Sequence, residues 1–276
     1  MPAEGLDAMP TTDEPSPADA ASAGASHRVT PAPPNVVVVV TGAGAIAPDV
    51  VAGVVALAPD VVVAADGGLD WARASDLRPD VLIGDLDSVS APGLAWADQH
   101  GTVIRHPADK TATDTELAVA YAAALGPRRL VLVAGPGDRL DHTIAAVGAL
   151  GSATADTADT RDTGTPGVTH GTSDTSDPAG AVDIDVVEAW WGDDRLLVAT
   201  PRRRVTLDEP PGTTFSVLAM HGQATGVSIT GARWPLSGAT LGPVTGQGVS
   251  NAVVDGLVTV TVDDGTLTII IPGAQP

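Results

Sequence analysis

The chain has 276 residues, a hydrophobic content of 43% and a formal net charge of −20. This length suits one large domain or two small ones, and the charge argues against nucleic acid or an anionic membrane surface as a partner. Cysteine is absent, which excludes disulfides and thiolate zinc sites. The first residues lack the basic and apolar regions of a secretory signal, and the run NVVVVV is too short to span a bilayer, so we expect a cytoplasmic protein.

Two segments show no hydrophobic period and are rich in small polar residues, Pro and Gly. They are residues 1–34 and 152–181. Such compositions cannot bury enough apolar surface to offset the entropy lost on ordering. We therefore predict a disordered tail and a disordered insertion in a surface loop, with His170 of the insertion having no functional role.

Between these segments, strand-like and helix-like runs alternate along the chain. The strand-like runs are 35–42, 60–68, 79–85, 128–135 and, after the insertion, 184–191. The runs of helical composition are 48–58, 113–125 and 141–150. Continuously apolar strands separated by helices indicate a parallel sheet covered on both faces. Residues 35–193 are therefore predicted to form a Rossmann-like α/β nucleotide domain.

The pattern changes at about residue 195. The runs DRLLVAT, TTFSVLAM, GVSITGARW, GLVTVTVDDG and TLTIII are strand-like, with turn residues between them and no helical segment. This succession is typical of a small all-β domain, either a sandwich or an open barrel. We adopt a β-sandwich over residues 194–276.

The stretch VLIGDLDSVS (81–90) contains the first candidate site. An apolar run reaches a glycine and then presents Asp85 and Asp87. Residues two apart in an extended chain point to the same side, so the two carboxylates would lie together at the end of a buried strand. Their mutual repulsion calls for a cation between them.

The stretch TGAGAIA (41–47) supports a different class of protein. Gly42, Gly44 and Ala47 fit the pattern G-x-G-x-x-A after a strand, and Asp66 follows about 20 residues later, as in the dinucleotide-binding fingerprint. An NAD(P)-binding Rossmann oxidoreductase is therefore an alternative. A tight strand-to-helix turn in a chain rich in Ala and Gly would give the same pattern.

Two further strand ends carry polar residues. In AADGG, Asp66 ends a strand and Gly67 would let backbone approach a ligand. In ADKTATDTELA, Thr113 or Asp114 would cap a helix, and Lys110 is the only lysine of the chain, which suggests a specific role.

The loop AGPGDRLDH (134–142) also joins a strand to a helix. Arg139 in a glycine-rich loop suits the binding of phosphate. A helix cap at Asp141 beside a surface arginine explains the same residues equally well. The chain has no G-x-x-x-x-G-K-[ST] motif, so a nucleotide would bind without a P-loop.

The motifs ADGG, GDLDS, DKTATDTE and GDRLDH stand in the order and spacing found in the thiamine pyrophosphokinase (thiamine diphosphokinase) family. ITGARWPL (229–236) and GVSNAV (248–253) resemble the substrate-binding domain of the same family. The resemblance covers residues 35–276 apart from the insertion. It departs from the family pattern at Thr111, where an acid is usual, and at Asp138, where a glycine is usual.

The resemblance implies transfer of a pyrophosphoryl group from ATP to the hydroxyl of thiamine, which releases AMP. It also implies a homodimer with sites between the subunits. The matching motif positions give the implied roles. Mg²⁺ would be held by Asp85, Asp87 and Asp114, with Asp66 nearby. The ATP region would include Asp66, Gly67, Lys110, Thr113, Arg139, Asp141 and His142, and thiamine would contact Trp234, Ser250 and Asn251.

Magnesium also fits the residues themselves, because proteins typically hold it with one or two carboxylates plus substrate phosphates. It would provide the cation that Asp85 and Asp87 require and would let an acidic chain bind ATP. Two alternatives remain beside the oxidoreductase: a non-catalytic nucleotide-binding regulator on the same fold, and a pterin-type alcohol as the acceptor. The general base stays unassigned, with Asp141 and His142 as candidates.

Overall fold

The computed structural model describes residues 32–137, 139–153, 184–243 and 245–274. The disorder predicted for residues 1–34 and 152–181 therefore falls almost entirely outside the described residues, as do His170 and Asp138. Within the described ranges, no helix combines the length and the apolar character needed to cross a membrane.

The first part of the chain forms a parallel sheet. Its strands lie in the order β6-β5-β1-β2-β3-β4, and every neighbouring pair is parallel. The bounds are β1 Val36–Val40, β2 Val61–Ala65, β3 Val81–Gly84, β4 Thr102–Arg105, β5 Arg129–Ala134 and β6 Val186–Trp191. The central strands are buried along almost their whole length, which explains why their sequences are continuously apolar.

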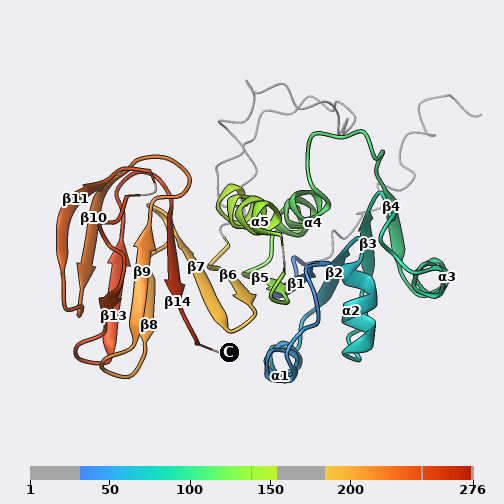
Figure 1. The fold of residues 1–276 in the computed structure, drawn as a ribbon, viewed down its shortest axis with the longest axis horizontal. Coiled ribbons are helices and arrows are strands. Elements are labelled where there is room, and N and C mark those ends of the chain that lie inside the picture. Colours follow the sequence, from blue (N-terminus) through green and yellow to red (C-terminus); the bar gives the residue numbers. More distant parts are fainter. Residues whose placement is uncertain (1–31, 138, 154–183, 244, 275–276) are drawn as a thin grey trace, which may run out of the picture. The chain divides into compact units, whose positions relative to one another are not determined.

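Helices cover both faces of this sheet, as predicted. The bounds are α1 Pro48–Ala56, α2 Gly68–Ala74, α3 Ala91–His100, α4 Asp114–Ala124 and α5 Leu140–Ser152. Helices α4 and α5 lie on one face, α1 and α2 lie on the other, and α3 packs beside β4 (Figure 1). Each face has its own core: Val119 and Ala146 belong to the first, and Val54 and Ala72 belong to the second.

Three elements of this part were not predicted, namely α2, α3 and β4. The strand predicted over 60–68 ends at Ala65, and Gly68 already begins α2. That helix has seven residues and no side-chain cap, so its sequence lacks the usual start signal. Strand β4 has four residues, none of them fully buried, and it lies at the sheet edge.

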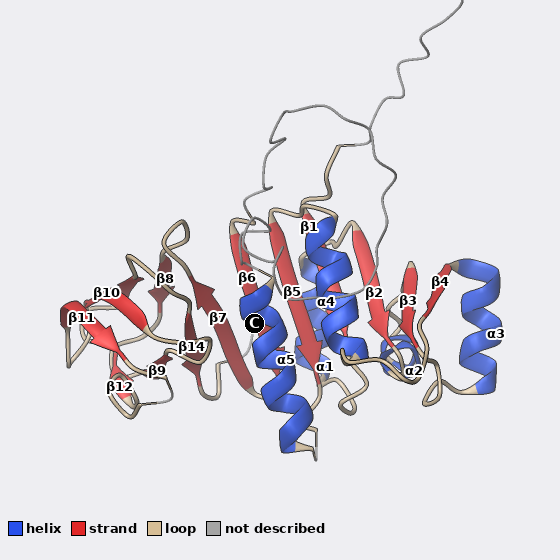
Figure 2. Ribbon diagram, turned by 90° about the horizontal axis from the view of Figure 1, so that it is seen from above, coloured by secondary structure: helices blue, strands red, loops and turns tan. Residues whose placement is uncertain are grey.

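The second part of the chain is a β-sandwich, which confirms the predicted fold class. Strands β7, β14, β9 and β12 extend the first sheet to ten strands, and a second sheet has the order β11-β10-β13-β8 (Figure 2). The bounds are β7 Asp194–Ala199, β8 Val205–Asp208, β9 Thr214–Leu218, β10 Ala224–Thr230, β11 Leu236–Leu241, β12 Asn251–Ala252, β13 Leu257–Thr261 and β14 Leu267–Ile271. Inward side chains of both sheets, including Phe215, Ile229 and Ile269, form one buried core.

The two parts share the hydrogen-bonded pair β6–β7. Glu188 of β6 is fully buried and forms ion pairs with Arg129 of β5 and Arg195 of β7, the latter at 3.0 Å between Nη2 and Oε2. The boundary proposed at 193/194 falls at the β6–β7 turn. Backbone hydrogen bonds and the ion pair of the buried Glu188 with Arg195 cross it, so the ten-stranded sheet runs through both proposed domains.

Candidate functional site

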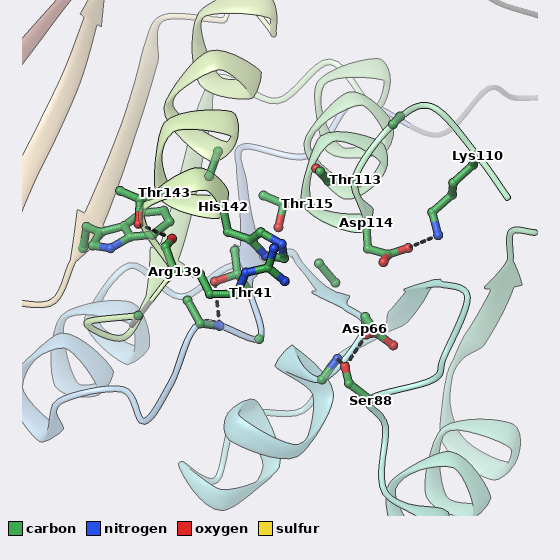
Figure 3. A pocket seen from close by; sticks show the side chains of 18 of the residues that line it. Thr41, Asp66, Ser88, Lys110, Thr113, Asp114, Thr115, Arg139, His142 and Thr143 are labelled. Atoms are coloured by element: carbon green, nitrogen blue, oxygen red, sulfur yellow. Dashed lines mark hydrogen bonds and ion pairs between the residues drawn. The ribbon is translucent and has the colours of Figure 1, made fainter. Parts of the chain in front are cut away.

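A cavity of about 450 Å³ opens at the carboxyl ends of the parallel strands. Strand β1 lies in the middle of the parallel order, with β2 on one side and β5 on the other, so the chain reverses its direction of travel there. Open α/β sheets bind ligands at this switch point. The cavity is lined by residues that follow these strands: Thr41 to Ala43 after β1, Asp66 and Gly67 after β2, and Gly137 and Arg139 after β5 (Figure 3).

Three carboxylates meet beside the cavity, and of these only Asp66 is among the residues that line it. Asp66, Asp85 and Asp87 each have a side-chain oxygen within 4.8 Å of the other two. Asp66 Oδ1 is buried and accepts no hydrogen bond from any residue that the structure describes. The backbone has a positive φ at Asp66 (46°) and at Leu86 (69°), and non-glycine residues held in this region concentrate at functional sites. Such a group of hard oxygen donors suits a divalent cation.

Ser88 holds Asp66 in place. Its hydroxyl donates to Asp66 Oδ2 and accepts from the backbone N–H of Gly67, at 3.2 Å (Figure 3). Burial raises the pKa of Asp66, the hydrogen bond from Ser88 opposes this shift, and the neighbouring aspartates raise the pKa further. The folded protein therefore disfavours ionisation of Asp66 beside the other aspartates, and a bound cation would offset the repulsion among these carboxylates.

Lys110 lies between two of the predicted metal ligands. Its Nζ is 2.8 Å from Asp85 Oδ2 and 3.1 Å from Asp114 Oδ1. The hydrogen bond from Lys110 lowers the pKa of Asp85. Burial alone would lower the pKa of Lys110, but its hydrogen bonds to both carboxylates outweigh burial and raise it. The sole lysine is thus a charged member of the site.

Asp114 lies close to this group but has different partners. Besides the ion pair with Lys110, its Oδ1 accepts a hydrogen bond from the backbone N–H of Asp85 at 3.2 Å. The structure therefore brings together Asp85 and Asp87, as the sequence suggested, but groups them with Asp66.

Gly84 makes this convergence possible. A Cβ at Gly84 would lie 3.0 Å from Asp114 Oδ1 and 3.1 Å from Asp66 Cβ, and its φ is 154°. A side chain at the end of β3 would therefore push the two aspartates apart.

Thr113, one of the two residues predicted to cap this helix, is the N-cap of α4. Its hydroxyl accepts from the N–H of Glu116 at 3.2 Å, and Glu116 Oε2 accepts from the N–H of Thr113 at 2.6 Å. This capping box fixes the helix start that carries Asp114, and Thr113 also lines the cavity.

The loop after β5 places Arg139 and His142 at the cavity, and Asp141 is absent from its lining residues. Arg139 Nη2 lies 2.6 Å from Asp141 Oδ2 in an exposed ion pair. The hydrogen bond from Arg139 holds the pKa of Asp141 below its ordinary value. Asp141 is therefore a weak base, whereas His142 faces the space where a substrate would lie.

The glycine pattern after β1 has a packing role. A Cβ at Gly135 would lie 2.5 Å from Ala45 O, and a Cβ at Gly42 would lie 3.4 Å from the backbone nitrogen of Gly68. The loops after β1, β2 and β5 thus contact one another through backbone. The match to a dinucleotide fingerprint is explained by this close approach of three loops.

The residues predicted to meet thiamine form a separate group in the β-sandwich. Trp234 is 54% exposed, and the guanidinium of Arg233 lies 4.8 Å from its ring centroid. Asn251 is buried, and its amide bonds both the N–H and the C=O of Trp234, at 3.0 and 2.8 Å. Ser250 is exposed and has a φ of 58°. None of the three predicted residues is among those that line the cavity.

Sequence reasoning missed several residues of the cavity, notably Thr41, Ser88, Thr143 and Trp191. Ser88 lay within the GDLDS motif but was given no role. Trp191 ends β6 beyond the insertion, where no motif drew attention to it.

Comparison with known protein families identifies both parts of the chain. A model of the thiamin pyrophosphokinase catalytic domain matches residues 56–160, and a model of the thiamin pyrophosphokinase vitamin B1 binding domain matches residues 203–267. Together they span more than half of the chain. A comparison with curated protein sequences gave no match.

Solved structures share the fold at low identity. Thiamine pyrophosphokinase from Bacillus subtilis has a TM-score of 0.64 and 15% identity, with 86% of this chain and 98% of that chain covered. The yeast enzyme has a TM-score of 0.62 and 14% identity, with 87% and 86% covered. The Geobacillus thermodenitrificans protein has a TM-score of 0.59 and 20% identity, with 86% and 97% covered.

The fold and its matches define an enzyme of the transferase class, a kinase of thiamine diphosphate biosynthesis. The chain belongs to the thiamin pyrophosphokinase family. Its reaction is the transfer of the pyrophosphoryl group of ATP to thiamine. The oxidoreductase and the non-catalytic regulator are therefore set aside.

Proposed function

We propose that the cavity binds Mg-ATP and that Asp66, Asp85 and Asp87 hold the Mg²⁺. The observation that carries this proposal is the meeting of three carboxylates within 4.8 Å, one of which has a buried oxygen without a hydrogen-bond partner among the described residues. Bound there, Mg²⁺ would offset the charge of the carboxylates and of the polyphosphate.

Asp114 has a supporting role in this proposal. It holds Lys110 and accepts a hydrogen bond from the backbone of Asp85, so it fixes both the ammonium group and the strand end beside the metal. Lys110 and Arg139 would contact phosphate oxygens, because phosphoryl transfer asks the protein mainly for positioning and for neutralisation of charge.

The reaction forms a bond between the hydroxyethyl oxygen of thiamine and the β-phosphorus of ATP. It breaks the bond from that phosphorus to the oxygen that bridges to the α-phosphate, and AMP leaves with the electron pair. The hydroxyl proton must also leave. His142 is the better-placed acceptor of the two candidates, because it lines the cavity and Asp141 is held ionised by Arg139.

Thiamine would stack on the exposed indole of Trp234, with Ser250 beside it and Asn251 orienting the tryptophan backbone. Asn251 lies on β12, the first strand of the ten-stranded order, and the metal site lies at the end of β3, the ninth. This separation within one chain supports a homodimer in which each site takes its ATP residues from one subunit and its thiamine residues from the other. The match to a vitamin B1 binding domain favours thiamine over a pterin-type alcohol.

Direct metal binding tests the ligand set. Mn²⁺ titrated calorimetrically into Asp87→Asn should bind at least about 10-fold more weakly than it binds the parent, and kcat should fall about 100-fold or more. Asp114→Asn should change the affinity for Mn²⁺ alone much less. Asp98→Asn, an exposed acid on α3, is the matched control. Parent-like Mn²⁺ affinity in Asp87→Asn, or a larger loss in Asp114→Asn, would contradict the assignment.

A further inference from the structure

The cavity contains a tryptophan to which neither family match extends. Trp191 lies between the matched ranges 56–160 and 203–267. It is the last residue of β6, and its backbone pairs with Ala134 at the end of β5. Side chains alternate along β6: Trp190 packs on the face covered by α1, whereas Trp191 packs against the core under α4 and α5. Trp191 is only partly buried there and lines the cavity with Thr143 and Ala146 of α5.

The end of β6 is held firmly against the neighbouring loop. The N–H of Gly192 donates to Ala134 O at 3.0 Å. Gly192 has a φ of 58°, and a Cβ there would lie 3.4 Å from Pro136 Cβ. The turn that follows Trp191 is thus packed on the loop that carries Gly137 and Arg139. The backbone at Trp191 is therefore held in place, and its indole forms part of the cavity wall.

The two ends of the cavity differ in chemistry. The acidic end follows β2 and β3 and contains Asp66 and the ion pair of Lys110 with Asp114. Trp191 lies at the other end, where β6 ends, and the lining also contains the small residues Ala43, Gly137 and Ala146. Figure 3 shows the same polarity, with Thr143 on one side, Asp66 and Lys110 on the other, and Arg139 between them.

The distance between these ends suits a nucleotide. Strands β5 and β1 separate β6 from β2, which makes three strand spacings, or about 14 Å. An extended nucleoside triphosphate has its charged phosphates at one end and a flat, weakly polar base at the other. Phosphates at the carboxylate end would place the base at the β6 end.

We propose that the indole of Trp191 is the surface on which the nucleobase of ATP stacks, an inference that rests on the proposed binding of Mg-ATP in this cavity. A fixed, partly exposed indole offers a flat apolar face to the base. Stacking of this kind is insensitive to the identity of the base, because every base has a π-face. Trp191 therefore contributes affinity for the nucleoside and little selection among nucleotides.

Binding of two ligands, one with a nucleoside and one without, distinguishes the contribution of the nucleoside to affinity from that of the phosphates. Trp191→Leu should weaken binding of Mg-ATP, measured without thiamine, about 10- to 100-fold, and should leave binding of Mg-tripolyphosphate within about 2-fold of the parent. Trp191→Phe should retain most of the affinity for ATP. Trp71→Leu, which removes a partly exposed tryptophan of α2 that does not line the cavity, should change neither ligand. Equal weakening of both ligands, or unchanged binding of Mg-ATP in Trp191→Leu, would overturn the inference.

A fluorescence titration provides the second arm, in case Trp191→Leu fails to fold. AMP should quench the tryptophan emission of the parent, and this quenching should disappear in Trp191→Phe. Quenching that persists in Trp191→Phe would overturn the inference. Failure of Mg-tripolyphosphate to bind the parent would instead contradict the metal-phosphate site of the proposed function, and the AMP titration would still decide the role of Trp191.

Discussion

Gly84 shows how one residue without a side chain can set the geometry of a charged site. It ends β3, and Asp66 and Asp114 approach it so closely that a methyl group would contact both. Aspartates from two other elements can therefore converge on the strand end that leads to Asp85. The repulsion among them is balanced by Lys110 on one side and, in the proposed function, by Mg²⁺ on the other.

Gly84→Ala should therefore affect both stability and turnover. The added Cβ and the unfavourable φ should reduce the free energy of unfolding by about 1–3 kcal/mol, and displacement of the aspartates should raise the Mg²⁺ concentration needed for half-maximal activity. Gly148→Ala, in α5, is the matched control, since nothing lies within 4 Å of its added Cβ and alanine favours a helix. Parent-like Mg²⁺ dependence in Gly84→Ala would show that the site tolerates a side chain there.

At the scale of elements, helix α5 packs directly on the turn after β9. His221 of that turn has its Nε2 3.2 Å from Thr268 Oγ1 of β14, and a Cβ at Gly151 of α5 would collide with the imidazole. Burial lowers the pKa of His221 below its ordinary value. The folded protein therefore favours the neutral imidazole at the contact between the α/β part and the sandwich.

This contact should make stability depend on pH below about 6.5, the ordinary pKa of histidine. As the pH falls through that value, the unfolded chain takes up a proton that the folded protein resists, so the free energy of unfolding decreases. Urea unfolding at pH 7.5 and 5.5 should show a smaller decrease for His221→Gln than for the parent. His100→Gln, an exposed histidine on α3, should behave as the parent does. Equal decreases in all three proteins would exclude His221 as a source of the dependence.

The alternation of apolar strands and helices was enough to predict the layered α/β part, because burial on both faces leaves a clear sequence signal. Helix α2 gave no such signal, since it begins at Gly68 without a capping side chain. The sequence placed Asp85 and Asp87 at a strand end. The family resemblance placed Asp66 near them but chose Asp114 as the third metal ligand; the grouping with Asp66 depends on the space left at Gly84 and on the positive φ of Asp66 and Leu86.

At the scale of the molecule, the ten-stranded sheet keeps the proposed nucleotide cavity and the residues proposed to bind thiamine apart within one chain. In the proposed homodimer each site combines Asp87 of one subunit with Trp234 of the other. Dimers of Asp87→Asn alone and of Trp234→Ala alone should each have little activity, because both sites of each dimer carry the defect.

Mixing the two variants under conditions of subunit exchange should restore activity. Each mixed dimer would have one intact site and one doubly altered site, so a statistical mixture should recover about a quarter of the parent activity. Activity that stays at the level of the separate variants, although exchange is demonstrated, would place Asp87 and Trp234 in sites made by the same subunit.

We propose that the carboxylate site drives transfer of an intact pyrophosphoryl group. The most direct test of this proposal is to identify the products formed from thiamine and Mg-ATP by the parent and by Asp87→Asn. We expect the parent to give AMP and thiamine diphosphate in equal amounts and the variant to give both at least about 100-fold more slowly. ADP with thiamine monophosphate, or parent-like formation of AMP by Asp87→Asn, would contradict the account.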